Sequence, residues 1–97
     1  MSIEAVRELS RTTQQRAVDD AFLRYTKEFE QSSPESLLER LTYLRNVAGT
    51  RERAVTNLLR RGQVMDAQSG LFEAARAHAE LRAAENVLGK LGVSVAY

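Results

Sequence analysis

The chain has 97 residues, enough for one domain, and carries 14 basic and 13 acidic side chains, a formal net charge of +1. A balance this close to neutral provides no global attraction to nucleic acid or to an anionic membrane. Cysteine is absent, which excludes disulfides, thiol catalysis and thiolate metal sites. No run of residues is apolar enough for a membrane span, so we expect no membrane partner.

The composition predicts a thin hydrophobic core. A chain of this length buries only about 60 to 65% of the surface that it exposes when unfolded. Hydrophobic residues make up 43% of the chain, but 13 of them are alanines, so large apolar side chains are scarce. We therefore expect closely packed helices whose core is completed by a protein partner or by other copies of the chain.

The first predicted element is a helix over residues 3–30, with Ser2 as its N-cap. Its apolar pattern stops between Ser10 and Arg16, where no side chain favours a core. Two interpretations fit this gap: one helix with a solvated middle, or two helices with a break near residues 10–13. We expect one helix, because the polar stretch has no glycine or proline, and glutamine and arginine are good helix formers.

An aromatic stripe lies near the end of this first helix. It consists of Phe22, Tyr25 and Phe29, spaced by three and four residues. Such a stripe usually belongs to a core and otherwise forms a recognition face.

The clearest helix covers residues 34–61. Ser33 suits the N-cap, Pro34 suits the first helical position, and Gly62 suits the residue after the C-terminus. Its apolar positions alternate in steps of four and three, interrupted only at Arg51; they are Leu37, Leu41, Leu44, Ala48, Val55 and Leu58. A helix with such a stripe is not stable alone in water, so we expect these positions to be buried.

A third helix is predicted over residues 66–91, with Asp66 as its N-cap and Gly92 after its end. Its apolar face follows the same spacing and includes Ala67, Leu71, Ala74, His78, Leu81 and Leu88. A neighbouring stripe of small residues permits close approach of another helix; it comprises Ala75, Ala79, Ala83 and Ala84. The short connection predicts that helices 34–61 and 66–91 form an antiparallel hairpin.

The sequence therefore predicts an all-α fold with three helices, built on a long antiparallel helical hairpin. We expect residues 1–97 to form a single domain with a C-terminal tail at 92–97. The end of this tail, Val-Ser-Val-Ala-Tyr, alternates like an edge strand that lies on the hairpin or pairs with another chain.

Catalytic and metal-binding constellations are missing from the sequence. The only histidine, His78, has no carboxylate three or four residues away on its own helix to orient it or share a metal. Phosphate-binding loops are also missing. We expect no catalytic residue, no metal, no cofactor and no enzymatic activity.

Positive charge is concentrated near the end of the second helix. Arg51, Arg53, Arg60 and Arg61 could contact an anion or the phosphates of nucleic acid. The near-neutral total charge and the lack of a helix face carrying Asn, Gln and Arg favour the alternative, in which these arginines cap carbonyls and pair with glutamates.

Two segments carry a family resemblance: LLRRG at Leu58–Gly62, and the alanine-rich run LFEAARAHAELRAAENVLGKL at Leu71–Leu91. Together they make residues 37–91 resemble the small helical co-chaperones of type III secretion needle proteins. In those proteins a helix ends at an arginine and glycine turn, and an alanine-rich helix returns. The resemblance implies a cytoplasmic stabiliser of a secreted or polymerising subunit.

We expect a non-enzymatic helical protein–protein interaction module: a small chaperone or structural subunit of a multi-protein assembly of the bacterial secretion or phage type. Its place would be the cytoplasm, a virion or a secretion assembly, and its partners another protein, copies of itself, or both. The residues expected to bind the partner are Phe22, Tyr25, Phe29, Leu37, Leu41, Leu44, Leu71, His78 and Leu81. The alternatives are a small regulator that contacts nucleic acid through Arg51–Arg61, and an inhibitor of another macromolecular machine.

Overall fold

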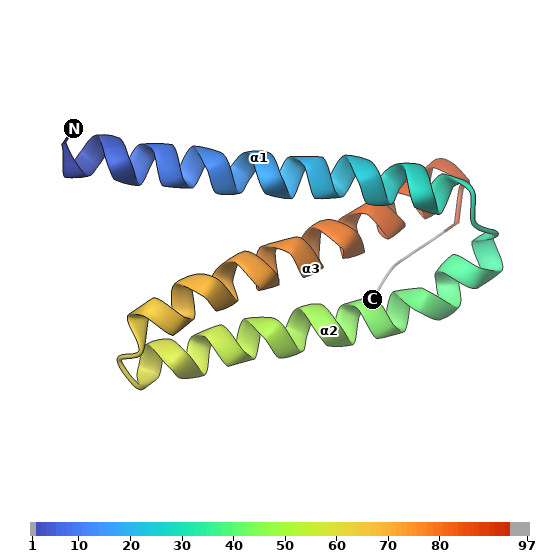
Figure 1. The fold of residues 1–97 in the computed structure, drawn as a ribbon. Helices are drawn as coiled ribbons and strands as arrows, with labels where there is room; N and C mark the ends of the chain where they lie inside the picture. Colours follow the sequence, from blue (N-terminus) through green and yellow to red (C-terminus); the bar gives the residue numbers. More distant parts are fainter. Residues whose placement is uncertain (1, 94–97) are drawn as a thin grey trace.

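The computed structural model describes residues 2–93, without the side chains of residues 3, 6–11 and 13. These residues form three helices, α1 (Ile3–Glu30), α2 (Pro34–Arg60) and α3 (Val64–Lys90), shown in Figure 1. The described part of the chain contains no strand. The predicted all-α fold and the antiparallel pairing of the second and third helices are confirmed.

Helix α1 is one continuous helix of 28 residues, as expected from the absence of glycine and proline in its polar stretch. It begins where the sequence predicts, because the Ser2 hydroxyl accepts a hydrogen bond of 3.1 Å from the Ala5 amide. The helix ends at Glu30, and residues 31–33 lead directly into α2.

Helix α2 has the predicted boundaries to within one residue. The Ser33 hydroxyl accepts a hydrogen bond of 3.2 Å from the Ser36 amide. At the other end, Gly62 adopts a φ of 75°, and the Gln63 amide donates to the Leu58 carbonyl at 2.9 Å. This glycine-dependent motif satisfies carbonyls of the last turn and reverses the chain.

The prediction that Asp66 caps α3 is wrong. The helix begins at Val64 after Gln63, whose side chain makes no capping hydrogen bond. The compact turn at Gly62 returns the chain to helical geometry two residues earlier than predicted, so Asp66 lies in the first turn, where its charge suits the helix dipole.

The far end of α3 follows the prediction. Gly92 has a φ of 76°, and the Val93 amide donates to the Leu88 carbonyl at 3.0 Å. These contacts repeat the motif that ends α2. The strand predicted in the tail covers residues 93–97; Val93 is not in a strand, and residues 94–97 lie outside the described part of the chain.

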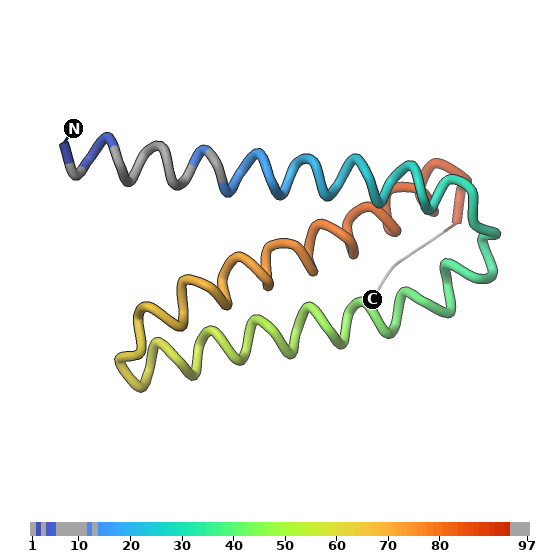
Figure 2. The backbone as a smooth tube through the Cα atoms, viewed as in Figure 1, coloured from blue at the N-terminus to red at the C-terminus, as the bar shows by residue number. Residues whose placement is uncertain are grey.

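Helix α3 is the central helix of the fold: it lies between α1 and α2 and packs against both, as the backbone trace in Figure 2 shows. Its small residues make this double contact close, since Ala79, Ala83 and Ala84 are completely buried. The predicted role of the alanine stripe in close packing is thereby confirmed.

The three helices form a flat layer. The principal extents are 47 × 29 × 17 Å and the radius of gyration is 15.7 Å. A compact domain of this length has a radius of gyration of about 12.5 Å. The layer therefore presents two broad faces, where a closed bundle would enclose more of its helix surface.

The core lies where the α1–α2 turn meets the C-terminal half of α3 (Figure 1). Its members are Phe29, Leu37, Leu41, Leu44, Ala48, Ala77, Leu81, Ala83, Ala84, Val87 and Leu88. Toward the hairpin turn, α1 diverges from the other two helices (Figure 1). Leu58, expected to be buried, is consequently only half-buried there, and Leu71 remains 55% exposed.

Candidate functional site

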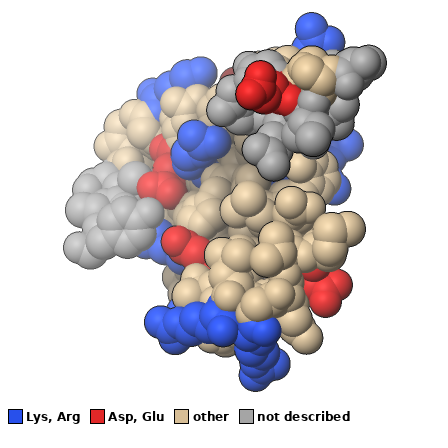
Figure 3. All heavy atoms as spheres, turned by 90° about the vertical axis from the view of Figure 1, so that its left-hand side faces the viewer, with Lys and Arg blue, Asp and Glu red and all other residues tan. Residues whose placement is uncertain are grey.

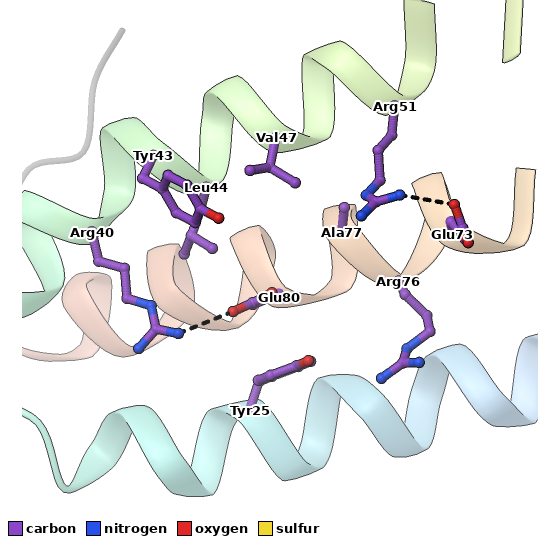
Figure 4. Close-up of a pocket in the computed structure, with 10 residues that line it drawn as sticks. All are labelled: Tyr25, Arg40, Tyr43, Leu44, Val47, Arg51, Glu73, Arg76, Ala77 and Glu80. Carbon is purple, nitrogen blue, oxygen red and sulfur yellow. Dashed lines mark hydrogen bonds and ion pairs between the residues drawn. The ribbon is translucent and has the colours of Figure 1, made fainter. Parts of the chain in front are cut away.

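One face of the layer carries an open groove of about 380 Å³ above α3, between α1 and α2 (Figure 4). Each helix contributes to it; the lining residues are Tyr25 from α1, Arg40, Tyr43, Leu44, Val47 and Arg51 from α2, and Glu73, Arg76, Ala77 and Glu80 from α3. The groove exists because α1 and α2 both pack on α3 while leaving a strip of its surface uncovered between them.

The groove has apolar walls. The Tyr25 ring stacks on the Phe29 ring, with centroids 5.9 Å apart, so the core holds it in place. Across the groove, Val47 packs against the core, while Tyr43 is 64% exposed. Two aromatic rings therefore flank a strip of α3 that contains the small side chain of Ala77 (Figure 4). Accessible aromatic rings beside such a strip are typical of protein-binding surfaces.

Two ion pairs connect α2 and α3 in the wall of the groove. Arg51 Nη1 lies 2.8 Å from Glu73 Oε2, and Arg40 Nη2 lies 3.5 Å from Glu80 Oε1 (Figure 4). Arg40, Arg51 and Glu73 are exposed and Glu80 is half-buried, so the Arg51–Glu73 pair contributes at most about 1 kcal/mol. Their main effect is to hold four long side chains in defined positions along the wall.

Arg76 contributes positive charge on the α1 side of the groove. It makes no ion pair with any other residue that the structure describes, and it points toward α1 in Figure 4. It also lines a second hollow of about 290 Å³, together with Arg24 and Asp20 of α1. This side of the groove thus presents two arginines near a single aspartate.

A further hollow of about 450 Å³ lies along α2 beside the groove. It is lined by Tyr43, Asn46, Val47, Thr50, Arg51 and Ala54. Sequence reasoning missed this surface, although a signal was present: Tyr43, Val47, Thr50 and Ala54 follow steps of four, three and four beside the core stripe. A second stripe of this kind makes the apolar face of α2 wider than the area that α3 covers.

The residues predicted to bind a partner do not form one surface. Five of them are buried by the protein's own helices: Phe29, Leu37, Leu41, Leu44 and Leu81. Phe22 and Tyr25 are half-buried, and of these two Tyr25 lines the groove. Leu71 is exposed and lines a separate hollow with Gln14 and Val18 of α1. Tyr25 and the buried Leu44 are therefore the two residues of the predicted set that line the groove.

His78 has a carboxylate neighbour that its own helix does not provide. Its Nε2 atom lies 3.5 Å from Glu52 Oε2, which belongs to α2. The spacing of residues in the sequence identifies neighbours on the same helix only. Glu52 lies beside His78 because α2 and α3 pack antiparallel.

The four arginines predicted to contact an anion do not gather in one patch. Arg51 pairs with Glu73, and Arg53 donates to the Thr50 hydroxyl at 3.4 Å. Arg60 and Arg61 are exposed at the hairpin turn. Successive helical residues differ by about 100° in direction, so residues 51 and 53 point to different sides of α2. Figure 3 shows basic groups at several separate places on this end of the molecule, with acidic groups between them.

Among the side chains that the structure describes, no three from His, Asp or Glu gather closely enough to hold a metal ion. No helix in this described range is long and apolar enough to cross a membrane. Comparison of the chain with protein-family models, with curated proteins and with solved structures gave no match.

Proposed function

We propose that this protein is a non-enzymatic helical interaction module, acting as a small chaperone or structural subunit of a multi-protein assembly, and that the groove face is its docking surface. The observation that carries the proposal is the open strip of α3 between α1 and α2, flanked by Tyr25 and Tyr43. An additional helix lying on this strip would close the layer into a bundle.

The side chains that line the groove favour a particular kind of partner. Tyr43 and Val47 offer apolar contact on the α2 side, which favours an amphipathic partner helix. Arg76 and Arg24 on the α1 side favour acidic groups along one edge of that helix. The Arg40–Glu80 and Arg51–Glu73 pairs provide polar contacts around the apolar strip, an arrangement common to protein interfaces.

Nucleic-acid binding is the weaker alternative. Arg51 is already paired with Glu73, and the remaining arginines of the predicted patch point in different directions. Phosphate binding is strongest where several unpaired cations follow one surface.

Site-specific photo-crosslinking in the native host tests the proposal. A benzophenone side chain placed at Tyr43 should give protein adducts of discrete mass. Leu23 provides the matched control, since it is a comparably exposed large apolar residue on α1 that does not line the groove. Equal adduct patterns at both positions, or none at Tyr43, would contradict the proposal.

A further inference from the structure

We infer that the partner covering the groove face is a second copy of this chain, stacked face to face with its α2 antiparallel to the first α2 and a two-fold axis passing between Ala48 and Gly49. This inference rests on the proposed function and names its partner. Four features of the described residues support it: the sequence of the α2 stripe, the distribution of charge along α2, a complementary charge contact on α3, and the size of the face.

The hollow on α2 is self-complementary about this axis. An antiparallel copy would bring Tyr43 opposite Ala54, so that the largest side chain of the stripe meets the smallest. The same register would bring Val47 opposite Thr50, two β-branched residues of similar volume.

The two other residues that line the hollow would also face each other across the two-fold axis with complementary polar groups. Asn46 would lie opposite Arg51, whose guanidinium can donate to the amide oxygen. All six residues lining the hollow are thus paired by one two-fold operation, which is the defining property of an isologous interface.

Charge along α2 favours the antiparallel orientation. Glu35 and Glu39 lie near its start, whereas Arg60 and Arg61 lie at its end, and all four side chains are exposed. In the proposed register, Glu39 and Arg61 of opposite copies are offset by three residues, about 4.5 Å of helix rise, which long side chains can span. A parallel orientation would bring like charges together at both ends.

The central helix gives a second complementary contact. Since Arg51 lies beside Glu73 and the two helices are antiparallel, the axis crosses α3 close to residues 75 and 76. Arg76 of one copy would then lie within one helical turn of Glu73 of the other. Arg76 has no ion pair within the described chain, and Glu73 is exposed enough to accept a second donor.

The face is large enough for a stable dimer. Its two long extents are 47 and 29 Å, while the layer is only 17 Å thick. A standard protein interface covers about 800 Å² of each partner, which requires only part of such a face. Two stacked layers would also cover the half-buried Tyr25 and the exposed Tyr43, the rings that flank the groove.

The experiment uses pairs of cysteines in the full chain, which is naturally free of this residue. The doubly substituted variant Tyr43→Cys/Ala54→Cys places the thiols opposite each other only between two copies. Within one copy the positions are separated by about 16 Å along the helix, far beyond the roughly 7 Å limit for Cα atoms in a disulfide. Both positions are exposed, so the fold should tolerate the changes, which circular dichroism can verify.

The matched control is Thr42→Cys/Arg53→Cys, which has the same spacing, is also exposed, and lies about 100° around α2 from the first pair. Mild oxidation of the purified protein should convert most of the first variant into covalent dimer and leave the control largely monomeric. Equal conversion of the two variants, or no covalent dimer from the first, would overturn the inference. If the first variant stays monomeric while Tyr43 still captures a different protein in cells, the second-copy inference fails and the proposed function stands.

Discussion

Replacing Phe29 by alanine distinguishes a core residue from a partner-binding residue. The aromatic stripe of α1 was compatible with either role, and the structure places the Phe29 ring at 0% exposure inside the chain's own core. The ring also stacks on Tyr25, and the Arg40 guanidinium carbon lies 5.5 Å from its centroid. Truncation would therefore remove packing from α1, α2 and α3 together.

The expected loss in the free energy of unfolding is large relative to its total value. Phe→Ala substitutions in cores cost about 3 to 5 kcal/mol, the sum of lost transfer free energy and the cavity left behind. A domain of this length has a total free energy of unfolding of about 5 to 15 kcal/mol. The melting temperature should fall by at least about 12 °C, from about 4 to 8 °C for each kcal/mol.

The assay is urea and thermal unfolding followed by circular dichroism, with all variants at the same protein concentration because association shifts apparent stability. Leu23→Ala is the matched control on the same helix, since its side chain is 58% exposed, and it should change stability by no more than about 0.5 kcal/mol. If Phe29→Ala does not fold, the milder Phe29→Leu should still destabilise measurably. A cooperative Phe29→Ala variant with a loss below about 1 kcal/mol would refute the placement of Phe29 in the core.

Three further predictions concern the turns, the ion pairs and nucleic acid. Gly62→Ala should cost about 1 to 2 kcal/mol because its φ is 75°, whereas Gly89→Ala, with no atom within 4 Å of an added Cβ, should be neutral or gain up to about 1 kcal/mol in urea unfolding. If Gly89→Ala destabilised the protein more than Gly62→Ala does, the result would contradict the described turn at Gly62. Glu73→Gln should lower stability by less than about 1 kcal/mol, and the difference should vanish in about 1 M salt; a larger, salt-independent loss would mean that its pair with Arg51 is not a surface ion pair. Fluorescence anisotropy should detect no binding to DNA or RNA at about 50 mM salt, and clear binding there would favour the nucleic-acid alternative.

Much of the fold was predictable because helix signals are local. Ser2 and Ser33 both cap the helices expected of them, and Gly62 and Gly92 both end helices in the left-handed conformation. The start of α3 was not predictable from Asp66, because the compact turn at Gly62 decides where helical geometry resumes.

The arrangement of the helices, and with it the groove, depends on contacts that are distant in sequence. Both the leucine stripe and the alanine stripe of α3 are visible in the sequence, but the divergence of α1 near Leu71 is not. That divergence, together with the open strip between α1 and α2, decides which apolar residues remain exposed. Tyr43 and Val47 were therefore missed, while buried members of the core stripe were assigned to a partner.

Sedimentation equilibrium of the purified full chain is the most direct test of the central claim that the groove face is an interaction surface for a second copy. The native protein should sediment as a dimer at micromolar concentration, and Tyr43→Glu should sediment as a folded monomer, because it places a charge in the proposed interface. Leu23→Glu, which alters an equally exposed apolar residue outside the groove, should remain a dimer. A native protein that is a stable monomer, or a dimer unaffected by Tyr43→Glu, would contradict the account.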